Sequence, residues 1–147
     1  MRRTVGLLTV AVTFWLVNGA GVGAQEREVG ETYLARLLDV WEQDASVAEV
    51  EALISLLSED ATYEHPRAGA RIDGRRAIEN GMASFLGSSR GPEATEVEIM
   101  SGPGVVVLGF DLRMEVHRGA DWSVVERRQV IVLEISDGRI VRVTDHW

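Results

Sequence analysis

The stretch DATYEHPRAGARIDGRRAI, residues 60–78, decides the fold of this chain. It joins the end of one helical pattern to the start of another, and it places Tyr63, Glu64 and His65 at the junction. Side chains two residues apart in an extended segment point to the same side. Tyr63 and His65 are therefore expected to reach into one cavity, where any chemistry would begin.

Residues 1–24 have the pattern of a secretory leader. Arg2 and Arg3 precede an apolar run from Val5 to Val17, and the small residues of Val22–Ala24 suit cleavage. An uncleaved membrane anchor is the alternative, but the run is shorter than the ~20 residues that a spanning helix needs. We expect an exported bacterial protein, periplasmic or secreted, with no stable membrane anchoring after cleavage.

Residues 25–147 are enough for a single domain with one core. The chain has 15 basic and 23 acidic residues, a net charge of −8, which becomes −10 without Arg2 and Arg3. Such a charge disfavours nucleic-acid binding. The chain contains no lysine and no cysteine, which excludes Schiff-base chemistry, disulfides, thiol nucleophiles and cysteine zinc sites. The histidines lack metal-ligand spacing, so we expect no metal and no cofactor.

Three helical patterns come first along the predicted domain. Apolar residues at helical spacing predict a helix over 33–41, and a Ser-x-x-Glu capping box at Ser46 opens a second that runs to about Ser58. A third pattern follows Gly74 and closes at Gly87. The segment from there to Pro92 is rich in Gly and Ser and predicts a loop.

From residue 95 the apolar period changes to two, which indicates strands. Turn signals separate four of them, at 95–99, 105–117, 122–135 and 139–147. Strands joined by short turns form an antiparallel meander. Helices packed on such a sheet predict an α+β layer fold.

Three pieces of the sequence together resemble the SnoaL-like branch of the nuclear transport factor 2-like superfamily. They are LLSEDATYEHP at 56–66, IDGRRAI at 72–78 and VLEISDGRIVRVTDHW at 132–147. The resemblance implies a cone in which N-terminal helices pack on a curved antiparallel sheet. It does not imply one function, because this fold hosts isomerases, dehydratases, cyclases, epoxide hydrolases and binding domains.

Within that superfamily the polar residues resemble those of the limonene epoxide hydrolase group. That group has Tyr-x-Asn where this chain has Tyr63-Glu64-His65, Arg-x-Asp where it has Arg113-Met114-Glu115, and a strand-end Asp where it has Asp145. The resemblance implies hydrolysis of a small apolar epoxide. Asp145 would be the base and Glu115 the acid, Tyr63 and His65 would position water, and Arg113 would bridge the two carboxylates.

Strand alternation supports a pocket position for Asp145 but not for Arg113 and Glu115. Val141, Val143 and Asp145 share one face of the last strand, as a carboxylate at the end of a pocket would. Arg113 and Glu115 share a charged face, which in an antiparallel sheet is often solvated. They would enter a pocket only if a bulge changed the alternation, and the sequence shows none.

Other functions stay open. His65 before Pro66 occupies the place of the catalytic Asp in the Glu-Asp-Pro of related ketosteroid isomerases, which implies a histidine base for proton transfer. The oxyanion-hole donors of those isomerases correspond here to Trp41 and Ile131, which do not replace them. A non-catalytic domain that binds a small apolar molecule is also possible, with Trp41, Met82 and Phe85 lining its pocket. The apolar strand 130–135 would further allow homodimerisation through the sheet.

Overall fold

Three α-helices cover the sheet in the computed structural model, which describes residues 22–147. They are α1 (Val22–Trp41), α2 (Val47–Ile54) and α3 (Arg75–Ala83), and a single 3-10 turn, η1 (Pro66–Ala68), lies between the last two. The predicted capping box opens α2: Ala48 N–H donates to Ser46 Oγ, and Ser46 N–H donates to the Glu49 carboxylate. The capping box is therefore confirmed.

Six strands form one sheet in the order β2-β1-β6-β5-β4-β3. The first two flank η1, and the other four make the predicted meander. β1 pairs with β6 in parallel, whereas every other neighbouring pair is antiparallel. The bounds are β1 (Leu57–His65), β2 (Ala70–Asp73), β3 (Ser89–Gly102), β4 (Val105–Arg118), β5 (Asp121–Ser136) and β6 (Arg139–His146).

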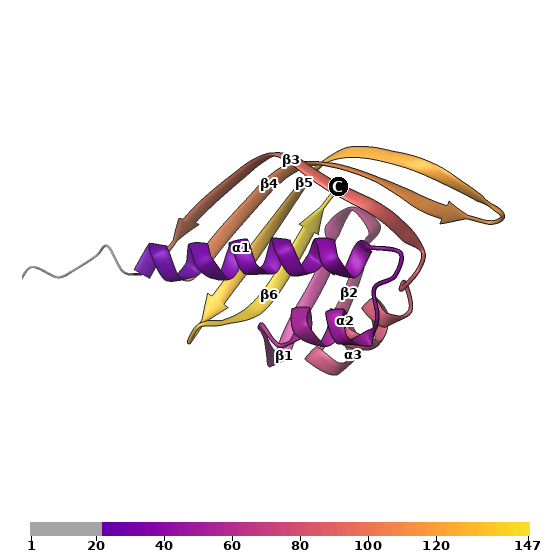
Figure 1. Cartoon of the computed structure of the whole chain (residues 1–147). Coiled ribbons are helices and arrows are strands. Elements are labelled where there is room, and N and C mark those ends of the chain that lie inside the picture. The colour runs from indigo at the N-terminus through magenta and orange to yellow at the C-terminus, as the bar shows by residue number, and fades with distance from the viewer. Residues whose placement is uncertain (1–21) are drawn as a thin grey trace, which may run out of the picture.

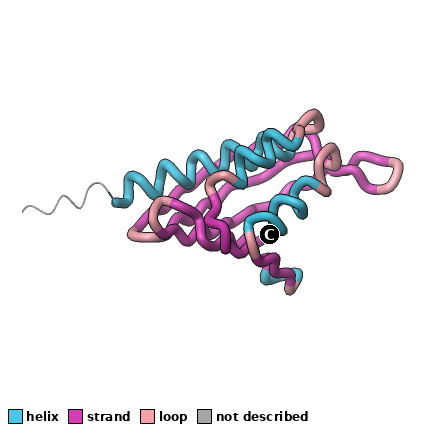
Figure 2. Tube along the Cα trace, turned by 90° about the horizontal axis from the view of Figure 1, so that it is seen from below, coloured by secondary structure: helices cyan, strands magenta, loops and turns pink. Residues whose placement is uncertain are grey.

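The helices and the sheet form two layers. α1 runs across one face of the curved sheet, and the tip of the β4–β5 hairpin projects beyond the helices (Figure 1, Figure 2). Gly30 allows α1 to lie close to β4, because a Cβ at that position would lie 2.6 Å from Val106 Cγ1. The observed layers confirm the predicted α+β fold.

One apolar core fills the space between the layers. Its members come from all three α-helices and from the inward faces of the strands. Within residues 22–147 the core contains nineteen buried hydrophobic residues, among them Tyr33, Leu37, Leu53, Ile78, Leu108, Phe110, Leu112, Ile131, Leu133 and Val143. Burial of one face of β4 and of β5 explains the alternation seen in their sequences.

Several predicted boundaries are wrong, among them the start of the first helix, which begins at Val22 instead of near Tyr33, and the end of the third, which lies at Ala83 instead of Gly87. Two further differences have a common cause. The second helix ends at Ile54 instead of near Ser58, because Leu57 pairs with Ile140 and starts β1. The predicted loop to Pro92 is the beginning of β3, since Ser89 pairs with Val116 in the long β4. In both places a distant strand supplies backbone partners that local sequence does not reveal.

The predicted secretory leader lies outside the described residues, apart from Val22–Ala24, which form the start of α1. Its cleavage stays a prediction. Within residues 22–147, no helix is long and apolar enough to cross a bilayer.

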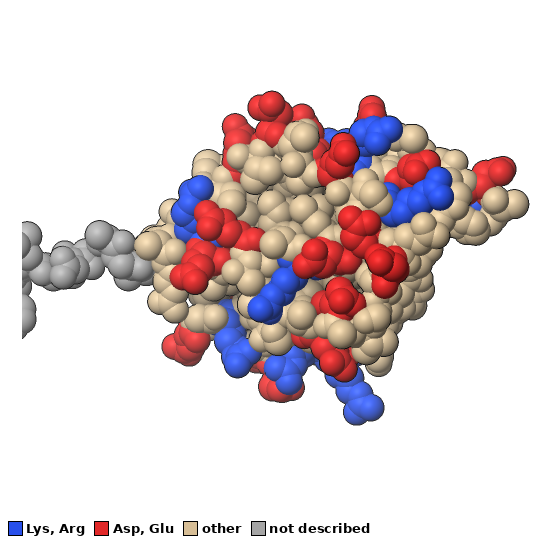
Figure 3. Space-filling model, in the orientation of Figure 1, with Lys and Arg blue, Asp and Glu red and all other residues tan. Residues whose placement is uncertain are grey.

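Acidic and basic side chains are interspersed over the face that carries α1 (Figure 3). This face therefore presents no continuous surface of one charge.

Candidate active site

Two strands that are distant in sequence bring the polar residues together. Tyr63 and His65 lie on β1, which runs parallel to β6, with Tyr63 opposite Val143. Their rings meet edge to face with centroids 5.0 Å apart, so they do point to the same side. Asp145 on β6 also points inward, and only 3% of it is exposed. The inward orientation expected from alternation is therefore correct for these three residues.

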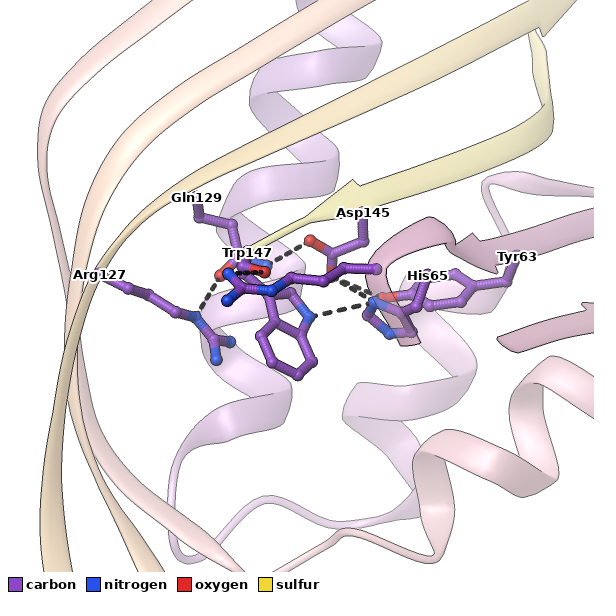
Figure 4. Close-up of polar contacts among 7 residues, drawn as sticks. Tyr63, His65, Arg127, Gln129, Asp145 and Trp147 are labelled. Carbon is purple, nitrogen blue, oxygen red and sulfur yellow. Dashed lines mark hydrogen bonds and ion pairs between the residues drawn. The ribbon is translucent and has the colours of Figure 1, made fainter. Parts of the chain in front are cut away.

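Asp145 is held at both oxygens. The Tyr63 hydroxyl donates to Asp145 Oδ2 at 2.9 Å, and Gln129 Nε2 donates to Oδ1 at 2.5 Å (Figure 4). His65 Nδ1 lies 3.9 Å from Oδ2. Donors on both oxygens fix the plane of the carboxyl group and compensate for its loss of water.

Arg127 and Gln129 on β5 complete the polar cluster. Arg127 Nε donates to Gln129 Oε1 at 2.9 Å, so the neutral amide stands between the guanidinium and Asp145. The guanidinium also lies over the Trp147 ring, 4.5 Å from its centroid. Neither residue is among those predicted from the sequence. Their signal was that they alternate in phase with the apolar Ile131 and Leu133 on the same strand.

Burial sets the acid strength of these groups. It raises the pKa of the Asp145 carboxyl above its ordinary value of 3.8, and the hydrogen bond from Tyr63 is the largest of several opposing effects. Burial also raises the pKa of the Tyr63 hydroxyl, which therefore stays a hydrogen-bond donor at neutral pH. The pKa of Arg127 is lowered, first by burial, although Asp145 and Tyr63 oppose the shift.

An apolar cavity of about 480 Å³ opens onto this cluster. Its floor is polar, with Tyr63, His65, Arg127 and Asp145, whereas the walls are mostly apolar. The wall residues come from α1, β2, α3 and β4, together with the chain around α3 and β6. They are Leu37, Val40, Trp41, Ala70, Ile72, Ile78, Gly81, Met82, Phe85, Met114 and Trp147. Such a cavity suits a small apolar molecule with one polar group.

A family model described as a SnoaL-like domain matches residues 34–143, most of the chain. The chain belongs to the SnoaL-like domain family. No curated protein matches this SnoaL-like chain.

Solved structures share the fold of this SnoaL-like protein. It is 25% identical to a candidate ketosteroid isomerase from Kribbella flavida over 85% of this chain and 78% of that one, with a TM-score of 0.60. A candidate polyketide cyclase from Xanthomonas campestris is 16% identical over 86% of this chain and 93% of that one, with a TM-score of 0.70. An LEH-like epoxide hydrolase from M. tuberculosis is 18% identical over 84% of this chain and 83% of that one, with a TM-score of 0.65. The last two show the fold alone, and together these names cover isomerases, cyclases and an epoxide hydrolase.

The expected positions of Arg113 and Glu115 must be corrected. β4 pairs with β5 without a register shift, so its alternation is unbroken and both residues point away from the cavity. Arg113 pairs instead with Glu126, and Glu115 with Arg90. Arg113 therefore does not bridge Glu115 and Asp145. Met114, between them, faces the cavity.

The other predicted site residues line the cavity of this SnoaL-like protein. They are the predicted catalytic residues Tyr63, His65 and Asp145 and the predicted pocket residues Trp41, Met82 and Phe85. Phe85 is the most open of these, with 70% exposed. Their contact with a substrate stays a prediction. Within residues 22–147, no three His, Asp or Glu side chains gather as metal ligands would.

Asp145 is expected to make stability depend on pH. The folded state binds its proton more tightly than the unfolded chain, so its contribution is complete below about pH 3.8 and is lost as pH rises through the raised pKa. Tyr63, His65, Gln129 and Arg127 face the carboxyl, and their effects do not reverse the rise. Asn at this position cannot ionise. The Tm of Asp145→Asn should therefore increase relative to that of wild type as the pH rises from 3.8 through the raised pKa of Asp145. Thermal unfolding across that range measures the difference, and a difference independent of pH would contradict the expectation.

Proposed function

We propose that this SnoaL-like protein catalyses proton transfer at a carbon next to the carbonyl group of a small, mostly apolar molecule. The observation that carries the proposal is the buried carboxyl of Asp145 at the floor of an apolar cavity. Its raised pKa makes it a stronger base than an exposed aspartate. Tyr63 and Gln129 orient it without neutralising its charge.

The proposed reaction balances within the substrate. Asp145 takes a proton from the carbon, the C–H electron pair forms a C=C bond with the carbonyl carbon, and the carbonyl π pair moves to oxygen. The substrate carries a second C=C bond between its β and γ carbons, so the anion is a dienolate. As the carbonyl re-forms, the pair of the enolate C=C bond moves to make a Cα=Cβ bond, and the pair of the β,γ bond takes the proton back from Asp145 at Cγ. The product is an isomer, so no co-reactant is required.

Arg127 is the proposed partner of the enolate oxygen. Its Nε is engaged by Gln129, and among residues 22–147 no acceptor is hydrogen-bonded to its two Nη groups. The guanidinium lines the cavity and is held by the Trp147 ring, so its position is fixed before a ligand arrives. Fixed donors stabilise developing negative charge most effectively in a site with little water.

Epoxide hydrolysis is the second candidate. It is favoured by one observation, the convergence of Tyr63, His65 and Asp145, which could hold and activate a water molecule. Hydrolysis also needs an acid for the leaving oxygen. Glu115, the acid inferred from the sequence, lies on the other face of the sheet, and no second carboxylate lines the cavity as described. Proton transfer needs one carboxylate only, and we therefore rank it first.

A substrate panel separates the candidates. The protein would be incubated in D₂O with small cyclic β,γ-enones and, separately, with small epoxides. Double-bond migration, seen by ultraviolet absorbance, together with deuterium uptake by mass spectrometry is the expected result. Diol formation from an epoxide would favour the second candidate. Inertness toward both panels, with a panel member bound, would contradict catalysis and favour a binding domain.

A further inference from the structure

Trp147 contacts both of the polar side chains that could meet a ligand oxygen. Its indole Nε1 donates to His65 Nδ1 at 3.1 Å, and the two rings meet edge to face with centroids 5.6 Å apart (Figure 4). The Arg127 guanidinium lies over the indole ring of Trp147. Its backbone carbonyl accepts a hydrogen bond from Arg67 Nη1 at 3.3 Å. The indole ring is therefore fixed from several directions.

The indole bond has a chemical consequence for the histidine. A ring nitrogen that accepts a hydrogen bond carries no proton, and the neutral imidazole has one proton for two nitrogens. With Nδ1 engaged as acceptor, the proton of His65 stays on Nε2. Among residues 22–147, no hydrogen bond involves His65 Nε2, and His65 lines the cavity.

We infer that Trp147 is a positioning residue that fixes the tautomer of His65, so that His65 offers an Nε2–H donor to the oxygen of a bound ligand. His65 then acts as a donor, not as the histidine base that its place in the sequence suggested. A neutral imidazole can polarise a carbonyl in this way without giving up its proton. The assignment deepens the proposed function: the site takes molecules with an oxygen acceptor, and His65 and Arg127 would share it.

His65 Nδ1 has two possible hydrogen-bond partners, the Trp147 indole and the Asp145 carboxylate, and they require different tautomers. Asp145 Oδ2 lies 3.9 Å from the same nitrogen, and the Tyr63 and His65 rings meet edge to face. A proton on Nδ1 would exchange the indole bond for a bond to the carboxylate. The two arrangements therefore predict opposite tautomers, and only the one with the indole bond leaves Nε2–H for a ligand.

Nitrogen NMR of the ligand-free protein tests this inference. Histidine would be labelled with ¹⁵N and observed at about pH 9, where imidazoles are neutral, with His65 assigned from its loss in His65→Gln. In wild type, Nε2 should carry the proton. Trp147→Phe keeps a ring but removes the indole N–H, and it should reduce the Nε2–H to Nδ1–H ratio about three- to tenfold, the worth of one hydrogen bond.

Trp122→Phe is the matched control. Trp122 also meets a histidine edge to face, His117 at 5.2 Å, but on the β4–β5 hairpin away from the cavity. It should leave the His65 signals unchanged. A proton on Nδ1 in wild type, or an unchanged ratio in Trp147→Phe, would overturn the inference.

A second measurement does not depend on the fold of Trp147→Phe. The indole N–H signal of Trp147 should move in His65→Gln, while that of Trp122 stays in place; an unmoved Trp147 signal also counts against the inference. Neither measurement uses a substrate. An inert enone panel would therefore refute the proposed reaction and leave the tautomer result standing.

Discussion

Asp145→Asn is expected to lower kcat/KM by about 10²- to 10⁴-fold, the usual contribution of a general base. Asparagine has nearly the same shape, can accept from Gln129 and can donate to Tyr63, but it cannot take a proton. The fold should therefore persist while proton transfer is lost. The rate of deuterium uptake by the enone turned over by wild type measures the loss.

Asp111→Asn is the control for that experiment. Asp111 lies on β4 with its side chain exposed, paired with Arg128 on the outer face of the sheet. It should retain wild-type activity. If Asp145→Asn kept full turnover, Asp145 could not be the base, and the proposed mechanism would be abandoned.

Arg127→Met is expected to lower kcat/KM about 10²-fold, because one preorganised donor to the enolate oxygen is lost. The substitution also removes a positive charge that holds the pKa of Asp145 down in part. The pKa of Asp145 should therefore rise further, and the acid limb of the kcat/KM profile should move to higher pH. Rates measured across the pH range report both effects in one experiment.

Arg128, the neighbour of Arg127 in the sequence, supplies the matched control for Arg127→Met. Arg128 points to the outer face, where it pairs with Glu98 at 2.6 Å and with Asp111. Arg128→Met should change neither the rate nor the acid limb. Equal effects of the two substitutions would show that Arg127 acts through general charge and not at the oxygen of the substrate.

Much of the fold could be predicted from local patterns. The capping box at Ser46 and the turn at Asp137-Gly138 are read directly from neighbouring residues, and both stand where expected. The β1–β2 hairpin was missed. β2 has only four residues, Ala70–Asp73, and β1 depends on its parallel pairing with β6, which no local pattern encodes.

The candidate site was predictable only in part, for a related reason. Asp145 follows the apolar alternation of its strand, so its inward direction could be deduced. Arg113 and Glu115 were placed by resemblance against their own alternation, and the unbroken β4–β5 register shows that the alternation was the better guide. The same rule applied to β5 would have found Arg127 and Gln129. Trp147 was missed because it lies at the end of a strand, where periodicity carries little information.

The parallel contact between β1 and β6 also has a kinetic meaning. The bond from Tyr63 to Asp145 joins residues 82 positions apart, so it closes one of the longest loops in the domain. The hairpins of β3, β4, β5 and β6 need only short loops and can form first. We therefore expect the polar floor to assemble late in folding, so that a chain with its meander already formed would still lack the oriented carboxyl group.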